Sequence, residues 1–196
     1  MYLRLANMDD LPQLKVVYRR IINNMNDEKI EIWDDIYPCE FFYNDIENNC
    51  LYVLVEKDEI VSAFALCNSN AGADCVKWKN EHDKVLYIDR FGVNINYLRK
   101  GIGSIMLNKA ISLAREKGAE YLRLFVVDIN EPAINLYIKN GFERAEGIYD
   151  EVIDDDLVLH EFGFEIKTSN GWNALCRRLE KSVWKSNNGI SFLFVL

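Results

Sequence analysis

The stretch with the clearest chemical content is Arg99-Lys100-Gly101-Ile102-Gly103-Ser104, which stands directly before a long helical pattern. The first turn of a helix leaves backbone N–H groups without intrahelical acceptors, and the helix dipole adds partial positive charge there. Glycines let the backbone approach an anion closely. Two cationic side chains and a hydroxyl accompany them. This combination predicts a cradle for a phosphate or pyrophosphate group.

Two familiar phosphate-binding motifs do not fit this stretch. The dinucleotide-binding fingerprint needs a third glycine three residues after Gly103, where this chain has Met106. The Walker loop needs Gly-Lys-Ser or Gly-Lys-Thr after four spacer residues, and the sequence contains neither. A plainer interpretation stays open, in which Gly101 and Gly103 only shape the entry to the helix.

The segments around the cradle alternate between strand and helix patterns. A β-favouring segment, Val85–Val93, comes before it, and apolar residues at helical spacing predict a helix over Ile102–Lys117. A mostly apolar strand follows at Tyr121–Val127, and then a helix at Glu131–Lys139 with Asn130 as its N-cap.

The rest of the chain completes an α/β domain. Further strands are predicted at 1–6, 51–56, 60–66, 142–148 and 157–166. Further helices are predicted up to residue 25 and from Pro38 to 48, with a loop or short helix at 26–37 and a loop at 68–84. Alternation in the middle and hairpins at the ends predict one mixed sheet with helices on both faces.

Composition limits the class of function. The chain has 196 residues, with 23 Lys and Arg against 31 Asp and Glu and a net charge of −8. Nucleic-acid binding is not expected, because phosphate contacts need clustered basic residues. The charge suits a cationic partner or serves only solubility. No apolar run is long enough to span a membrane, and no secretory signal is visible, so a cytoplasmic location is expected.

Cysteine and histidine usage argues against a metal centre. The five cysteines form no C-x-x-C motif, and the two histidines, His82 and His160, lie far apart. An odd number of cysteines without zinc-like spacing predicts neither a disulfide framework nor a metal site, and it suits a reducing compartment.

Two strings resemble the coenzyme A-binding region of the GNAT N-acetyltransferases. They are RKGIGSIMLNKAI, after a strand that ends in FGV, and LFVVDINEPAINLYIKNGFE, at the separation that the family shows. The Trp…Tyr-Pro segment within 31–66 is a weaker likeness. The resemblance covers about residues 1–166. It implies a largely antiparallel, twisted mixed sheet with a splayed parallel strand pair at the cofactor site, and acetyl-CoA as co-substrate without a metal.

The resemblance also implies which residues bind the cofactor. The pantetheine arm would pair with the backbone of Phe91, Gly92 and Val93. The pyrophosphate would lie on the loop and helix start formed by Leu98, Arg99, Lys100, Gly101, Ile102, Gly103 and Ser104. Asn130 matches the family's asparagine that contacts the cofactor arm. The family usually has Gln or Arg where this chain has Leu98, so side-chain contacts to the phosphates are expected to differ.

Tyr137 matches the family's tyrosine that protonates the departing thiolate, although its apolar neighbours suit a core tyrosine as well. The attacking amine must be neutral, which requires a base or a water chain. On a regular strand Asp89 faces the same side as Tyr87 and Phe91, which makes it the first candidate base. Gly92 hints at a bulge, and such a bulge would leave Asp89 pointing elsewhere. His160 is a weaker candidate.

Acidic and aromatic residues suggest a cationic substrate. Trp33 and Tyr37, beside Asp34 and Asp35, predict a wall that would bind a cation. The acidic run over 149–156 is interpreted as a solvated loop, with substrate recognition as the alternative. A polyamine, an aminoglycoside-like molecule, an amino-acid amine or a protein amine would suit these features.

The sequence therefore predicts an acetyltransferase domain at residues 1–166 that transfers the acetyl group directly to a primary amine. The alternative is a non-catalytic acyl-CoA-binding or sensor module with the same fold. Residues 167–196 end in the apolar string ISFLFVL. This tail is predicted to be a last strand, a contact in a homodimer, or an extension that is not native to the domain.

Overall fold

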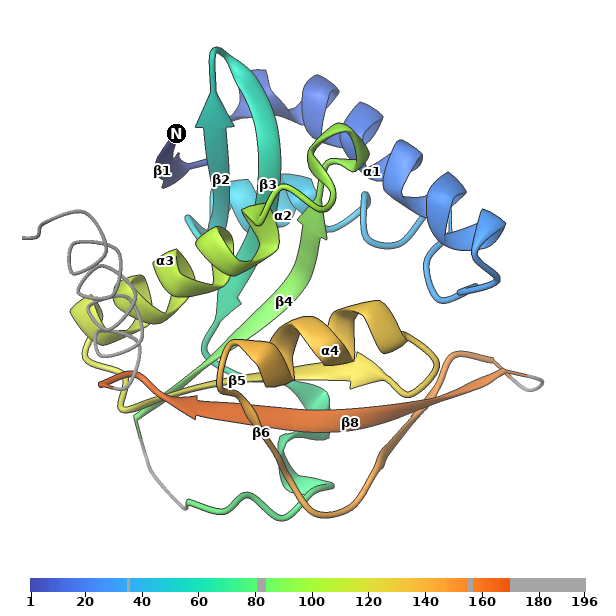
Figure 1. Ribbon diagram of the computed structural model, residues 1–196, viewed down its shortest axis with the longest axis vertical. Coiled ribbons are helices and arrows are strands. Elements are labelled where there is room, and N and C mark those ends of the chain that lie inside the picture. The colour runs from blue at the N-terminus through green and yellow to red at the C-terminus, as the bar shows by residue number, and fades with distance from the viewer. Residues whose placement is uncertain (35, 81–83, 155–156, 170–196) are drawn as a thin grey trace, which may run out of the picture.

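The computed structural model describes residues 1–34, 36–80, 84–154 and 157–169, and its strands form one eight-stranded sheet (Figure 1). The strands are β1 (Tyr2–Leu5), β2 (Leu51–Glu56), β3 (Glu59–Cys67), β4 (Val85–Val93), β5 (Tyr121–Val127), β6 (Glu143–Arg144), β7 (Tyr149–Val152) and β8 (Val158–Lys167). The helices are α1 (Leu11–Asp27), α2 (Phe42–Glu47), α3 (Ile102–Glu116) and α4 (Glu131–Lys139).

The sheet is mixed and largely antiparallel. Its order is β1-β2-β3-β4-β5-β8-β6, with β7 also paired to β8. Every pair is antiparallel except β4 with β5, which are parallel and joined through α3. The fold class predicted from the sequence is confirmed, including the parallel pair in the middle of the sheet. The predicted tail lies almost wholly outside the described residues.

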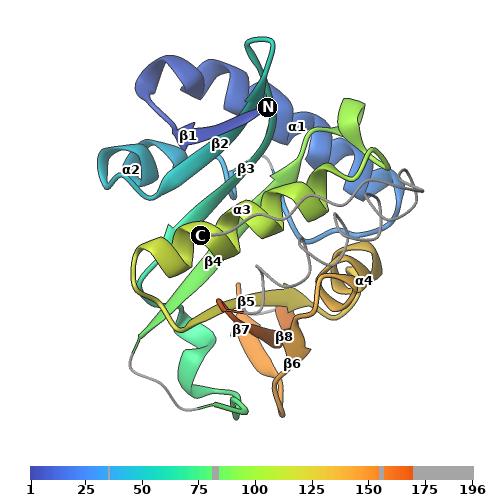
Figure 2. The same ribbon diagram turned by 60° about the vertical axis from the view of Figure 1, so that its left-hand side comes forward.

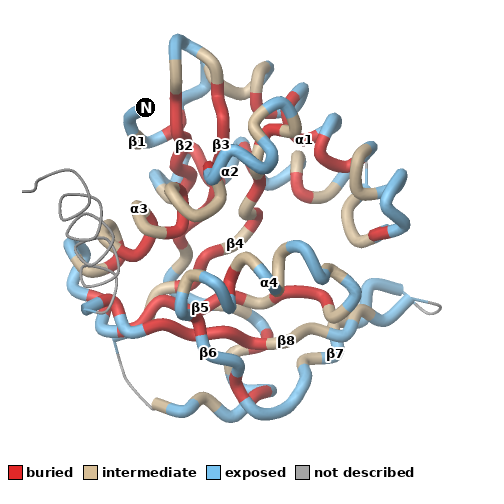
Figure 3. The backbone as a smooth tube through the Cα atoms, viewed as in Figure 1, coloured by how far each residue is buried: buried red, intermediate tan, exposed pale blue. Residues whose placement is uncertain are grey.

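The two faces of the sheet carry separate cores. Alternate residues of a strand point to opposite faces. On one face, β2 and β3 pack against α1 and α2, and on the other β3, β4, β5 and β8 pack against α3 and α4 (Figure 2). The buried residues therefore lie in the central strands and on the sides of these helices that face the sheet (Figure 3). The site described below lies where the central strands meet both layers.

Strand β4 contains a bulge in its pairing with β3. Ala63 is opposite Gly92, and Ala65 is opposite Asp89, so two residues of β4 oppose one residue of β3. Within the bulge Arg90 has a φ of +51°, a left-handed conformation that is uncommon for a residue with a side chain. A bulge bends its strand and changes which way the following side chains point.

The bulge corrects one expectation about the site. Asp89 is opposite Ala65, which belongs to the core beneath α1 and α2, whereas Phe91 packs against the core beneath α3 and α4. The two side chains therefore lie on opposite faces of the sheet. The prediction for a regular strand, that they share a face, was wrong, because β4 bulges next to Gly92.

Three element boundaries also differ from the sequence prediction. The second helix begins at Phe42 rather than Pro38, after a turn. The strand predicted over 142–148 is reduced to β6, because Gly147, with a φ of +99°, lies in a bend before the chain continues. Residues 149–152, predicted as loop, form β7, since Tyr149 and Glu151 alternate inward against β8.

Tyr18 of α1 holds the bulge from the α1 face. Its hydroxyl donates to the Arg90 carbonyl oxygen at 2.5 Å and contacts the Ala63 carbonyl oxygen at 3.3 Å. A Cβ atom added at Gly92 would lie 2.8 Å from the Tyr18 ring and hydroxyl. The glycine predicted to mark a bulge thus permits the close approach of α1 to β4.

We expect Gly92→Ala to lower the free energy of unfolding by about 1–3 kcal/mol, because the added methyl group overpacks against Tyr18. Urea denaturation measures the change. Tyr18→Leu is the partner variant, and the double variant should lose less than the two single losses added together. Strictly additive losses would contradict the proposed clash.

Candidate active site

The parallel strands β4 and β5 separate partway along their length. Their paired residues run from Val85 with Tyr121 to Ile88 with Leu124, and the pairing ends there. Strand β4 continues to Val93 and β5 to Val127. Beyond Ile88 the facing edges of the two strands are not joined by ladder hydrogen bonds, so an extended ligand has free backbone groups to pair with.

A cavity of about 680 Å³ occupies this separation. Gly101, Gly103 and Tyr137 line it from the face that carries α3 and α4, and Trp33 and Tyr37 line it from the face that carries α1. This volume falls within the usual range for a small-molecule site. The cavity therefore reaches through the sheet, with different chemistry on its two sides.

The glycine-rich turn shapes one side of the cavity. Gly101 is the N-cap of α3 with a φ of +79°. Within the described residues, a Cβ atom added there would meet nothing within 4 Å beyond the neighbouring backbone. The Ile105 N–H donates to the Gly101 carbonyl at 3.1 Å, so the N–H groups of residues 102–104 precede the first helical bond. A Cβ at Gly103 would lie 2.9 Å from Leu136 of α4. Open backbone amides at a helix start fit a pyrophosphate group.

The polar side chains around this turn have distinct positions. The Ser104 hydroxyl accepts from the Asn140 amide at 3.0 Å. Lys100 donates to the Asn96 carbonyl at 2.8 Å, and its ammonium lies 5.0 Å from the centre of the Tyr97 ring. Leu98, which replaces the family's polar residue, is exposed and lines the cavity. The backbone amides at the start of α3 are thus the groups of this turn best placed to meet an anion, and Arg99 also lines the cavity.

Helix α4 supplies the other predicted residues of this face. The Asn130 side chain accepts from the Ala133 N–H at 3.2 Å, so its predicted role as N-cap is confirmed. Tyr137 is 6% exposed and lies between the rings of Phe91 and Phe164, at centroid distances of 6.4 and 6.1 Å. Burial, and secondarily the charge of Asp89, raises the pKa of Tyr137 above its ordinary value. Its phenol is therefore protonated at neutral pH and faces the cavity.

The predicted aromatic residues meet Asp89 on the opposite face. Trp33 stacks on Tyr18 at a centroid distance of 5.7 Å, and the Tyr37 ring lies 6.3 Å from Trp33. The Tyr37 hydroxyl donates to the Asp89 carboxylate at 3.4 Å. Burial, with the charge of Asp89, raises the pKa of Tyr37. This side of the cavity is therefore aromatic, as the sequence indicated, and it is acidic through Asp89 rather than through Asp34.

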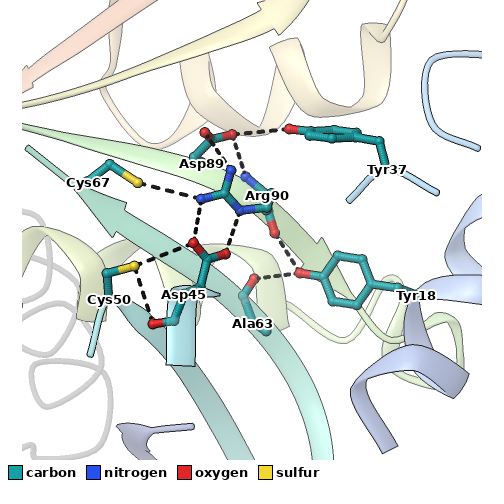
Figure 4. A network of polar contacts seen from close by, with 8 residues as sticks. All are labelled: Tyr18, Tyr37, Asp45, Cys50, Ala63, Cys67, Asp89 and Arg90. Atoms are coloured by element: carbon teal, nitrogen blue, oxygen red, sulfur yellow. Dashed lines mark hydrogen bonds and ion pairs between the residues drawn. The ribbon is translucent and has the colours of Figure 1, made fainter. Parts of the chain in front are cut away.

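A buried ion network holds Asp89 in place (Figure 4). The Arg90 guanidinium bonds Asp45 of α2 at 2.8 and 3.0 Å and Asp89 at 3.0 Å. The Arg90 N–H also donates to Asp89 at 2.8 Å. Burial alone would lower the pKa of Arg90, but Asp89 and Asp45 together raise it. Asp89 thus has both carboxylate oxygens engaged by protein groups.

Two further carboxylates interact with Asp89 through their charges. Sequence reasoning missed Glu161 and included Glu151 only within the acidic run over 149–156. Glu161 of β8 lines the cavity, and Glu151 of β7 lies near enough for its charge to act on Glu161. Burial, followed by the charges of Glu151 and Asp89, raises the pKa of Glu161 to about 8. The alternation of Glu161 and Glu165 with two phenylalanines was the available signal. This alternation predicts that Glu161 points to the cavity only once the pairing of β8 with β5 is known.

The other acidic and basic candidates lie elsewhere. Asp34 accepts from the N–H groups of Ile36 and Tyr37, both at 2.7 Å, and so caps a turn. His160 is exposed and pairs with Asp150 at 2.7 Å, on the opposite side of β8 from Glu161. Asp35, His82 and residues 155–156 of the acidic run lie outside the described residues.

The described residues also bear on membrane and metal binding. None of the helices in these ranges combines the length and apolar character needed to cross a membrane. The same part of the chain holds no group of three or more histidine, cysteine, aspartate or glutamate side chains that could bind a metal ion.

A family assignment follows from comparison with known sequences. The sequence profile of the "Acetyltransferase (GNAT) family" matches residues 18–142, which is more than half of the chain and includes the cradle, the splayed strands and most of the cavity. The chain therefore belongs to the GNAT acetyltransferase family.

Individual relatives agree with this assignment. An uncharacterized N-acetyltransferase of Methanocaldococcus jannaschii is 32% identical over 101 residues, which are 47% of this chain and 43% of that protein. Streptothricin acetyltransferase of Streptomyces lavendulae is 33% identical over 91 residues, 46% of this chain and 43% of that protein. The matches thus span less than half the length of these two relatives.

A solved structure shows the same fold. NAA60 of Arabidopsis thaliana, crystallised in complex with acetyl-CoA, superposes with a TM-score of 0.63 over 85% of this chain and 98% of that chain. The identity is 18%, so this likeness concerns the fold alone.

We expect Asp45→Asn to lower the free energy of unfolding by about 3 kcal/mol, because it removes a buried partner of Arg90. The side chains of Arg90 and Asp45 are only 8% and 9% exposed. Glu143→Gln is the matched control on the exposed pair with Lys79, and it should cost less than about 1 kcal/mol. Equal urea midpoints for the two variants would rule out a special role for the buried pair.

Proposed function

We propose that this chain moves the acetyl group of acetyl-CoA directly to the primary amine of a small cationic molecule. One observation carries the proposal. A single cavity passes between β4 and β5, with an anion cradle and a buried tyrosine on one face and aromatic and acidic side chains on the other. Two substrates of opposite charge can therefore reach the same point from opposite faces.

The cofactor side fits a thioester with a pyrophosphate group. The amides of residues 102–104 and the Arg99 side chain would hold the phosphates, and the free edge of β4 at 91–93 would pair with the pantetheine arm. Asn130 would contact the same arm while capping α4. Leu98 contributes apolar contact and no charge, so phosphate binding would depend on the backbone.

The chemistry requires no covalent bond to the protein. The amine nitrogen attacks the carbonyl carbon of the thioester, the C–N bond forms, and the C–S bond breaks with its electron pair on sulfur. Tyr137 is buried, protonated and on the cofactor side, so it is suited to give its proton to the departing thiolate. Two bound substrates and no acylated side chain predict kinetics through a ternary complex.

The acceptor side favours an ammonium group. Trp33 and Tyr37 offer aromatic faces, which attract cations, and Asp89 adds negative charge beside them. A small polyamine, an aminoglycoside-like molecule or an amino-acid amine would suit this lining. The alternative, a non-catalytic acyl-CoA sensor, would not need a buried acid on one side and a cation-binding wall on the other.

The proposed activity can be tested directly with purified protein. We expect calorimetry to detect acetyl-CoA binding, and thiol release to follow when amines are added. The panel contains 1,4-diaminobutane, spermidine, kanamycin, lysine methyl ester and a short peptide with a free N-terminus. Binding without thiol release on every amine would favour the sensor, and no binding at all would contradict both functions.

The proposed acid, Tyr137, can be tested by removing its hydroxyl group. We expect Tyr137→Phe to lower kcat by about 10²–10⁴-fold, the usual contribution of a positioned acid, while the Kd for acetyl-CoA stays unchanged. Tyr43→Phe, on an exposed tyrosine of α2, is the matched control and should retain full activity. A Tyr137→Phe variant with wild-type kcat would remove the tyrosine from the mechanism.

A further inference from the structure

The proposed reaction leaves one proton without an acceptor. An alkyl amine is an ammonium ion at neutral pH, and it must lose a proton before its nitrogen can attack. Asp89 was the first candidate on sequence grounds. Its two carboxylate oxygens, however, already accept from the Arg90 N–H, the Arg90 guanidinium and the Tyr37 hydroxyl. The ion pair with Arg90 at 3.0 Å also holds this carboxylate, so protein groups already occupy the oxygens that would have to accept the substrate's proton.

Glu161 differs from Asp89 in its surroundings. It lines the cavity, and within the described ranges no hydrogen bond or ion pair holds its carboxylate. Strand β8 pairs Glu161 with Val127 at the end of β5, which is the end that has separated from β4. Phe162 and Phe164 point into the core beneath α3 and α4, so Glu161 points to the acceptor face.

The groups that face Glu161 come from three elements. Asp89 lies on β4, Tyr149 and Glu151 lie on β7, and the residue opposite on β5 is the apolar Val127. Tyr37 lies beyond them and interacts with Asp89 and Glu151. These neighbours are neutral or negative. They therefore favour a carboxyl group that takes up a proton and returns it to solvent.

We propose that Glu161 is the base that removes a proton from the substrate ammonium, an inference that rests on the proposed acetyl transfer. Glu161 lies on the acceptor face and Tyr137 on the cofactor face of one cavity. Deprotonation of the ammonium and protonation of the departing thiolate thus take place on opposite sides of the sheet. Asp89 acts as a fixed negative charge that attracts the ammonium group.

The proton count is balanced. The ammonium gives one proton to the Glu161 carboxylate and becomes a neutral amine. After the C–N bond forms and the C–S bond breaks, Tyr137 gives its proton to the thiolate, and the remaining excess proton on nitrogen restores the phenol. Glu161 then releases its proton to solvent. The net products are the amide, free coenzyme A and one proton.

The pH dependence has a definite sign. Because the Glu161 pKa is about 8, the carboxyl group is protonated below this value and accepts a proton only above it. The wild-type kcat/KM should therefore rise as pH increases through about 8. The substrate amine also changes its protonation state with pH, and this affects the wild-type chain and the variant equally. The informative quantity is therefore the ratio of wild-type to variant kcat/KM at each pH, because the substrate's own titration cancels in that ratio.

The test compares Glu161→Gln with the wild-type chain, using the amine that the thiol-release panel selects. We expect the ratio to rise with pH through about 8 and to reach roughly 100-fold, in the range for a positioned base. With an aromatic amine that is already neutral at the assay pH, the ratio should fall to a few-fold. Calorimetry with acetyl-CoA checks that the Glu161→Gln variant is folded. Glu161→Asp keeps a carboxylate, so it should recover part of the rate and part of the rise in kcat/KM with pH.

Glu151→Gln is the electrostatic control. It removes one neighbouring negative charge, so it should move the rise in kcat/KM to lower pH without abolishing it. A Glu161→Gln variant with the wild-type rate and pH profile would overturn the inference. A loss that is the same at every pH and for every amine would also overturn it. A wild-type chain that releases no thiol with any amine would instead overturn the proposed function.

Discussion

Hydrogen bonding between β4 and β5 stops after the pair Ile88 and Leu124, although both strands continue. A parallel pair in the middle of a sheet is normally covered on both faces and fully bonded. Here the ladder ends early, and the cavity, its two chemically different sides and the access of each ligand all depend on that separation. Helices α3 and α4 line one mouth, and the segment after α1 lines the other.

The bulge in β4 explains how the sheet tolerates this interruption. Arg90 adopts a left-handed conformation in which its carbonyl is bound by Tyr18 and its guanidinium by Asp45 and Asp89. An unusual φ in a residue with a side chain persists only when the surroundings fix it. Here a hydrogen bond from α1 and an ion pair with α2 fix it. The same contacts position Asp89, so the acceptor wall and the shape of β4 are set by one network.

Local patterns explain why the sequence predicted the order of strands and helices and most residues of the cofactor side of the cavity. The glycines before α3, the Asn130 cap and the alternation of strands and helices depend on near neighbours along the chain. Tyr137 could be singled out from its position in a predicted helix and from the resemblance of that segment to the family's motif. The structure brings these residues to one cavity because helix starts and strand ends in this fold meet at the same edge.

Long-range contacts explain what the sequence did not reveal. The Arg90–Asp45 pair joins residues 45 positions apart, and neither position has a local signature. Glu161 reaches the cavity only through the register of β8 against β5. The acidic composition of β7 suggested a solvated loop rather than a strand. In the structure Tyr149 and Glu151 point inward and Asp150 points outward, which is the alternation of a strand. Gly92 hinted at a bulge in β4, but the left-handed residue is Arg90, and the sequence did not show that the bulge places Asp89 and Phe91 on opposite faces.

The open edge between β4 and β5 also ties the folded state to the supply of its ligand. A molecule that pairs with this edge binds the folded chain and not the unfolded one, so it shifts the folding equilibrium by mass action. At a hundred times its Kd such a ligand adds about 2.7 kcal/mol to the free energy of unfolding. That is a large share of the roughly 5–15 kcal/mol that keeps a typical domain folded. The lifetime of this protein in a cell would then depend on the concentration of the ligand that binds between β4 and β5.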